Sequence, residues 1–467
     1  MIEYINNNPL KMIVFFILLS GGIIYLSLKL KQLKNIFFIL VFYIPLSFAS
    51  GAGCLAMHMA IIIFLLSLIF DPQEKKIEYS FFEKVLIILL LITPILSFIN
   101  IDDIAPFFND RGKLRLSKEY WVVLSMLSNI ALYYLTKKYV NTKEDVLKIL
   151  KIMAISATIA SIAGYIQWLC PGHDFIFKYI VISDNPVWQR RVAATMQGYE
   201  MLAEYTAIII IFLGILCFLE KKKFYKLFYI ALMLNAFIIM TLTQTRGIYI
   251  SIAISILYLI CLLFLTGKIN LSIKYMIGSL LVFATLIALI FLIDRIRPES
   301  HFVERFLRFK ETVNIHKKYF GSRTGAWMWG IQIISKMSPL EKMFGSGCKH
   351  FPISKSKIYG ENKGWPHCLY LSYIIRDGFV GLSVFLLFLF WLYTKSIIPF
   401  LNYKKLKDKE LFIIGAGLHW GLIIFLIDEI KIEFIRSDRS QNIYWVFFGL
   451  IVVVASLIKR DINKEPQ

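Results

Sequence analysis

The sequence has little charge, and acidic residues are the scarcer of its charged types. Charged residues make up 18% of the 467 positions, with 31 Asp and Glu against 52 Lys and Arg. An ordinary soluble domain carries about 25% charged and about 45–50% apolar residues, whereas this chain is 58% apolar. That balance excludes a soluble globular protein, and the high apolar content excludes a disordered one.

Motifs for metal, disulfide and nucleotide chemistry are also missing. The six cysteines show neither a CxxC motif nor a zinc-ligand spacing. The sequence has no Walker motif, no GxGxxG after a strand and no metal-ligand cluster. We therefore expect neither a metal nor a cofactor, and any group that is transferred must arrive on an already activated donor.

What the sequence does contain is a series of long apolar runs. A helix that crosses the hydrocarbon core of a bilayer needs about 20 mostly apolar residues. The runs are continuous rather than alternating, which disfavours an outer-membrane β-barrel. The sequence therefore predicts an all-α polytopic membrane protein with twelve or thirteen transmembrane helices. The predicted spans are 12–28, 35–49, 54–70, 85–99, 120–136, 149–169, 199–219, 224–242, 247–266, 273–293, 368–394, 411–427 and 442–458.

One long polar stretch interrupts these spans. We expect a single integral membrane domain with N-terminal helices over 1–294, a long loop with short helices over 295–366, and C-terminal helices over 367–467. Within the loop, Ser322 can cap a helix that ends shortly before Pro339.

The basic residues predict an orientation. One set of alternate loops, which includes 137–151 and 395–409, contains about twice as many Lys and Arg as the short loops of the other set. The positive-inside rule places the first set, and with it the C-terminus, in the cytoplasm. Arg460 is the only arginine in those loops. Because arginine recognises phosphate in a bidentate manner, we expect the outer face to bind phosphate groups or anionic lipid, and not nucleic acid.

Arginines stand beside two short stretches of the outer face. Arg190 and Arg191 precede the 199–219 span, where they can clamp an anion or contact lipid headgroups. Arg246 lies in the tight turn before Gly247, and no acid lies within nine residues of it. A charge at the hydrocarbon boundary is costly without a partner. The alternatives for Arg246 are a bound anion and a snorkelling side chain.

Two further candidates lie near the end of the long loop. Arg323 would occupy the first turn of the loop helix, where its charge opposes the helix dipole unless an anion is bound there. His367 directly precedes the 368–394 span, and Pro366 is expected at the first helical position. The positive end of the helix dipole favours a neutral imidazole near pH 7, which can act as a general base. An interfacial histidine without a chemical role would show the same pattern.

Other polar residues lie in or beside the spans, and among them Arg376 with Asp377 forms either a structural ion pair or part of a pathway. Arg376 and Asp377 would lie about 13 Å into the 368–394 span. Because adjacent residues point in different directions on a helix, they should pair with other elements. The acids of the 428–433 segment are expected to be solvated, and His58 and His419 are expected to be core residues.

The outer-face residues form an ordered set of motifs that resembles a known superfamily. The motifs are Thr245-Arg246-Gly247, Ser322-Arg323 with Trp327, Gly345-Ser346-Gly347 with Phe351, and Pro366-His367-x-x-Tyr370. In this order they resemble the O-antigen ligase and O-antigen polymerase superfamily of bacterial membrane glycosyltransferases. The likeness covers about residues 185–395, and Glu200 stands where members of the superfamily often have asparagine.

The resemblance implies a metal-independent membrane glycosyltransferase with a GT-C-like helical fold. It implies transfer of a glycan from undecaprenyl pyrophosphate to an acceptor sugar hydroxyl, such as that of lipid A core, on the periplasmic face of the bacterial inner membrane. By position, Arg246 and Arg323 would hold the pyrophosphate and His367 would be the base. Arg190 and Arg191 would belong to the same substrate-binding surface.

Three alternatives remain open from the sequence. A polymerase of the same superfamily would use another undecaprenyl-linked repeat unit as acceptor. A transporter of an anionic or lipid-linked solute would place its charges at mid-membrane, whereas the candidate cations here gather on one face. A structural membrane scaffold is the third.

Overall fold

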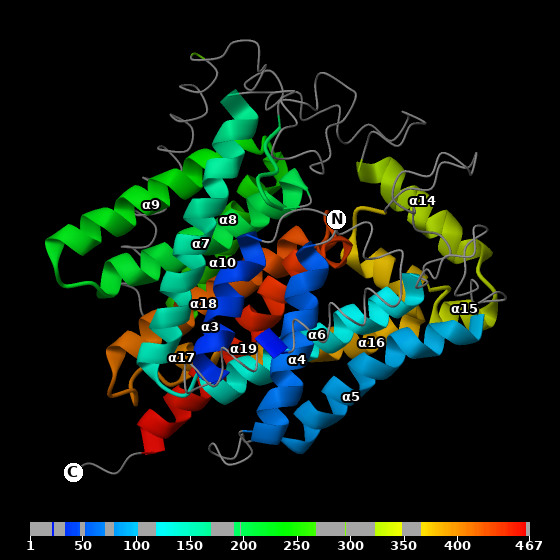
Figure 1. Ribbon diagram of the computed structural model, residues 1–467, viewed down its shortest axis with the longest axis horizontal. Coiled ribbons are helices and arrows are strands. Elements are labelled where there is room, and N and C mark those ends of the chain that lie inside the picture. The colour runs from blue at the N-terminus through cyan, green and yellow to red at the C-terminus, as the bar shows by residue number, and fades with distance from the viewer. Residues whose placement is uncertain are drawn as a thin grey trace.

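The computed structural model describes most of the chain as helices. The described residues are 21–22, 33–46, 52–70, 79–100, 118–169, 191–196, 198–267, 295, 323–347 and 366–463. Within them the structure is all-helical and contains no β-strand. The longer helices form one packed body, in which α8, α18 and α19 lie inside and α9 and α14 lie toward opposite ends (Figure 1).

The helices have the following bounds. They are α3 Leu33–Tyr43, α4 Ala52–Phe70, α5 Phe81–Leu96, α6 Lys118–Tyr139, α7 Lys143–Leu169, α8 Tyr199–Leu219, α9 Lys223–Leu242, α10 Arg246–Leu265, α14 Arg323–Lys336, α15 Pro339–Phe344, α16 Leu369–Ser396, α17 Ile398–Leu401, α18 Lys409–Asp428 and α19 Asp438–Asn463. Three short 3₁₀ turns, η1 Ile44–Leu46, η2 Ser97–Asn100 and η4 Phe434–Arg436, follow or precede them.

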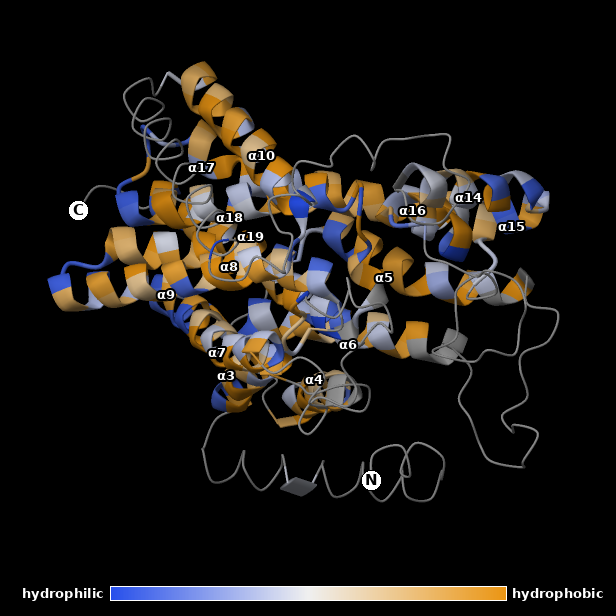
Figure 2. Ribbon diagram, turned by 90° about the horizontal axis from the view of Figure 1, so that it is seen from above, coloured by the Kyte–Doolittle hydropathy of each residue, from blue (hydrophilic) through white to orange (hydrophobic). Residues whose placement is uncertain are grey.

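These helices confirm a polytopic all-α membrane protein. Seven of the described helices are long and apolar enough to cross a membrane, and α3 with η1 and α4 are shorter apolar elements. Apolar residues dominate the long helices, as the hydropathy colouring shows (Figure 2). Every predicted span that falls on described residues coincides with a helix. Most of span 12–28 and all of span 273–293 lie outside the described residues, so the total of twelve or thirteen stays a prediction.

Ion pairs join several loops at one end of the helix body. Lys143 Nζ lies 2.7 Å from a carboxylate oxygen of Asp408 and 2.7 Å from one of Glu410. The backbone amide of Asp408 donates to Asp461 Oδ2 at 3.0 Å. Lys34 pairs with Asp145 at 2.8 Å. Apart from Glu410, which directly follows one of them, these residues belong to the lysine-rich loops that the sequence assigned to one side of the membrane, and the structure brings them together.

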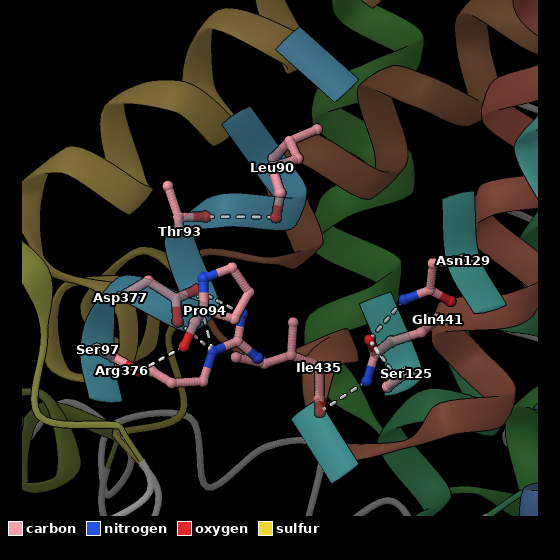
Figure 3. A network of polar contacts seen from close by, with 10 residues as sticks. All are labelled: Leu90, Thr93, Pro94, Ser97, Ser125, Asn129, Arg376, Asp377, Ile435 and Gln441. Atoms are coloured by element: carbon pink, nitrogen blue, oxygen red, sulfur yellow. Dashed lines mark hydrogen bonds and ion pairs between the residues drawn. The ribbon is translucent and has the colours of Figure 1, made fainter. Parts of the chain in front are cut away.

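A buried polar network joins α6 to α19. Gln441 Oε1 accepts hydrogen bonds from Asn129 Nδ2 at 2.9 Å and from Ser125 Oγ at 3.1 Å, and Gln441 Nε2 donates to the Ile435 carbonyl at 3.0 Å (Figure 3). Buried amides need such partners, because an unsatisfied polar group costs about 1–3 kcal/mol. The network fixes the end of α19 that leads to the η4 segment.

Helix α16 is broken at Gly378, whose φ of 72° is not helical. The break frees two carbonyls, and the loop after α15 satisfies them. The amide of Ser346 donates to the Ile375 carbonyl at 2.9 Å, and the amide of Gly347 donates to the Arg376 carbonyl at 3.0 Å. The short glycine-rich stretch 345–347 therefore completes α16 from outside.

Arg376 and Asp377 pair with each other, which the sequence analysis did not expect. Arg376 Nη2 lies 2.6 Å from Asp377 Oδ2. The break at Gly378 distorts the helix and allows this contact, beside the Pro94 end of α5 (Figure 3). His58 and His419 are buried, as expected, with 6% and 0% of their surface exposed.

Candidate functional site

The tight turn between α9 and α10 carries the first candidate residue. The backbone of Gln244 adopts φ 53°, a left-handed conformation that non-glycine residues rarely take. The amide of Thr245 donates to Thr243 Oγ1 at 3.2 Å. Arg246 is the first residue of α10 and is half-buried. The sequence-predicted arginine thus stands at a helix start, on a turn with an unusual backbone.

The side chain of Lys431, a second cation, lies against the start of α10. A Cβ added to Gly247 would lie 2.6 Å from Lys431 Nζ, so a larger residue at 247 would make the lysine side chain shift. Lys431 pairs with Asp428 and donates to Ser251 Oγ at 2.7 Å. Sequence reasoning missed Lys431, because nothing local to either segment signals its contact with Gly247.

The start of α8 faces the histidine candidate. Helix α8 begins after Gly198, and Glu200 lies in its first turn. Glu200 Oε2 lies 4.0 Å from His367 Nδ1, and 29% of the histidine side chain is exposed. A carboxylate beside one ring nitrogen favours the tautomer that leaves the other nitrogen available to accept a proton.

His367 itself lies just outside α16. Its backbone has φ 51°, and α16 starts at Leu369 with Cys368 as the N-cap residue. The expected place of Pro366 at the first helical position was therefore wrong, since the left-handed turn at His367 separates the proline from the helix. His367 remains at the N-terminal end of α16, with its ring toward α8.

Helix α14, which belongs to the long loop, also lies beside His367. Helix α14 runs over Arg323–Lys336, which confirms the helix expected between Ser322 and Pro339. Trp327 Nε1 donates to the His367 carbonyl at 3.2 Å. Arg323 precedes Trp327 by about one turn, or about 6 Å of rise. The start of α14 thus lies close to His367.

The acids of the 428–433 segment are buried, so the expectation that they are solvated was wrong. Asp428, Glu429 and Glu433 expose 1%, 0% and 0% of their surface. Their oxygens are used inside the protein. Glu433 Oε1 accepts from the Cys368 amide at 3.0 Å, and the Glu429 carbonyl accepts from the Leu369 amide at 2.9 Å. These acids hold the first turn of α16 in place.

Burial also shifts the pKa of one acid in this segment. Burial raises the pKa of the Glu429 carboxyl well above its ordinary value, the neighbouring Glu204 carboxylate raises that pKa too, and the hydrogen bond from the Phe434 amide lowers it.

Among the described residues, no group of three or more His, Cys, Asp and Glu side chains is placed to bind a metal ion.

The structure places the site residues that the sequence predicted as follows. Arg191, Arg246 and His367 are linked through the first turn of α8, since Thr245 Oγ1 donates to the Tyr199 carbonyl at 3.5 Å and Glu200 contacts His367. Arg323 begins α14, whose next turn contacts His367. Arg190 lies outside the described residues. Chain segments more than a hundred residues apart thus meet at one end of the bundle.

The fold and this cluster define a multi-pass helical membrane protein with basic residues and a histidine gathered at one end of its helices. Residues 228–386, about a third of the chain, match the family model described as O-antigen ligase. The matched stretch includes Arg246, Arg323 and His367. No curated protein matches the chain.

Proposed function

We propose that the protein transfers a glycan from undecaprenyl pyrophosphate to a sugar hydroxyl of lipid A core, on the periplasmic face of the inner membrane. The observation that carries the proposal is the convergence of the Arg246 turn, the start of α14 and His367, three elements within the matched family stretch. The gathering of lysine-rich loops at the opposite end supports a cytoplasmic C-terminus.

The proposed reaction is a direct displacement without a metal. The acceptor hydroxyl attacks the anomeric carbon, the bond to the pyrophosphate oxygen breaks, and undecaprenyl pyrophosphate leaves with the electron pair. His367 takes the hydroxyl proton. Arg246 and Arg323 stabilise the charge that grows on the leaving group. A single displacement inverts the anomeric centre. Arg190 and Arg191 contribute to the same donor surface, Arg191 in the manner argued below.

Transfer by the purified protein tests the proposal. The protein is reconstituted in vesicles without an ion gradient, with undecaprenyl-pyrophosphate glycan as donor and lipid A core as acceptor. We expect glycosylated core and one undecaprenyl pyrophosphate released per glycan transferred. Movement of the donor across the bilayer without product would identify a transporter instead. In a deletion strain, carrier-linked ladders with no glycan on core indicate a ligase, whereas single-repeat products indicate a polymerase.

Replacing His367 is expected to abolish transfer while the protein still folds. Because asparagine tolerates left-handed backbone better than other side chains with a Cβ, His367→Asn preserves the φ of 51° and removes the imidazole. Transfer is measured with the reconstituted protein, and the amount of folded protein by its thermal transition. Normal transfer by His367→Asn would show that the imidazole is not the base.

Glu200 is expected to assist the histidine. Replacing it with glutamine keeps the size of the side chain but removes the charge 4.0 Å from His367 Nδ1. We expect transfer to fall about 10- to 100-fold, the range seen for groups that orient a functional histidine. Glu200→Asp, which keeps a carboxylate, should retain more transfer than Glu200→Gln, and equal losses in the two variants would show that the charge beside His367 has no part in the reaction.

A further inference from the structure

Arg191 lies against the turn that carries Arg246. Arg191 Nε donates to the Thr243 carbonyl at 2.9 Å. Arg191 Nη2 lies 3.4 Å from the Gln244 carbonyl and 3.1 Å from Thr245 Oγ1. One guanidinium therefore contacts each of the three residues that separate α9 from α10, in the fork geometry that arginine has and lysine lacks.

The arginine is also held from its other side. Its guanidinium carbon lies 3.1 Å from the centre of the Tyr199 ring, at the start of α8. The stretch that follows Arg191 is anchored as well. The amides of Ala193 and Ala194 donate to Gln167 Oε1 of α7 at 3.2 and 2.8 Å. Contacts with α7 and α8 thus hold the segment that carries Arg191, whose guanidinium contacts the α9–α10 turn.

The α9–α10 turn needs hydrogen-bond donors from outside the turn. The last carbonyls of a helix have no partner within it, and the left-handed conformation of Gln244 is unfavourable for a residue with a Cβ. Arginine at 191 supplies donors to the carbonyls of Thr243 and Gln244. Without it, the carbonyls would turn toward other partners, and the position of Arg246 at the helix start would shift.

We propose that Arg191 is a positioning residue, which acts on the donor through the α9–α10 turn by fixing where Arg246 stands. This inference rests on the proposed function. It gives Arg191 a different task from that of a direct pyrophosphate ligand, because the Nε and Nη2 donors of its guanidinium already bind the protein. A lysine at this position keeps the charge but cannot bridge the three residues.

A double-mutant cycle with Arg246 tests the proposal. We expect Arg191→Lys to lower transfer about 10- to 100-fold, with a split between kcat and the KM for the donor that parallels that of Arg246→Lys. In the Arg246→Lys background, Arg191→Lys should cause at most a further twofold loss. Losses that multiply would show that Arg191 contacts the donor independently of Arg246, and would overturn the inference. Near-normal transfer by Arg191→Lys would overturn it as well.

The controls separate this result from misfolding and from failure of the proposed function. Lys226→Ala removes one exposed positive charge from the far end of α9 and should leave transfer unchanged. The thermal transition of each variant reports folding. If Arg191→Ala fails to fold, the lysine variant still completes the cycle. Absence of transfer by the unmodified protein would refute the proposed function, whereas multiplicative losses in an active protein would refute only the role of Arg191.

Discussion

Replacing Arg246 with alanine is expected to lower the rate of glycan transfer at least ~10²-fold. The reason is that negative charge builds up on the leaving pyrophosphate only as the glycosidic bond breaks. A cation held at that place stabilises the transition state more than the bound donor. Arg246 stands at a helix start, half-buried, on a turn that neighbouring segments hold in place. Arg323→Lys is expected to lose a comparable factor, because lysine lacks the planar fork.

Single-turnover transfer by the reconstituted protein measures this loss without interference from product release. Arg246→Lys, which keeps the charge, should retain more activity than Arg246→Ala. Lys226→Ala is the matched loss of one cation from the same helical hairpin, and it should transfer glycan at the normal rate. If both Arg246→Ala and Arg323→Lys transfer glycan near the normal rate, the assignment of the pyrophosphate site is wrong.

Replacing Gly378 with alanine is expected to destabilise the fold by at least about 3 kcal/mol. A Cβ at this position would lie 2.2 Å from the Met343 carbonyl oxygen, and the φ of 72° is itself unfavourable for alanine. The facing Gly345 is equally restricted, since its Cβ would lie 2.0 Å from the Arg376 carbonyl oxygen. Neither backbone can move away without losing the hydrogen bonds that complete α16.

The same substitution elsewhere in the bundle provides the control. Gly214 lies inside α8, and an added Cβ would meet nothing within 4 Å. Because alanine is favoured over glycine inside a helix, Gly214→Ala should be neutral or slightly stabilising. The thermal transition in detergent or nanodiscs measures both variants. A Gly378→Ala protein as stable as Gly214→Ala would show that α16 does not depend on the contact with 345–347.

The sequence was informative where the structure depends on local pattern. Continuous apolar runs gave the helices, because a membrane-crossing segment must be apolar over its whole length. Pro339 marked the boundary between α14 and α15, since proline starts a helix well and continues one poorly. The short turn before Arg246 fixed that arginine beside a helix start.

Contacts between distant segments could not be foreseen in this way. The charges of the 428–433 segment looked solvent-exposed, because the amides that they bind belong to residues about sixty positions earlier. The pairing of Glu200 with His367 joins positions separated by more than 160 residues. Similarly, nothing around Gly378 shows that the amides of Ser346 and Gly347 are available to satisfy the carbonyls of Ile375 and Arg376.

The break in α16 also has a consequence for how the chain is inserted into the bilayer. From Phe379 to Ser396 the helix rises about 27 Å, close to the roughly 30 Å thickness of the hydrocarbon layer. The translocon can therefore recognise this part alone as the span, and Arg376 with Asp377 need never enter the lipid.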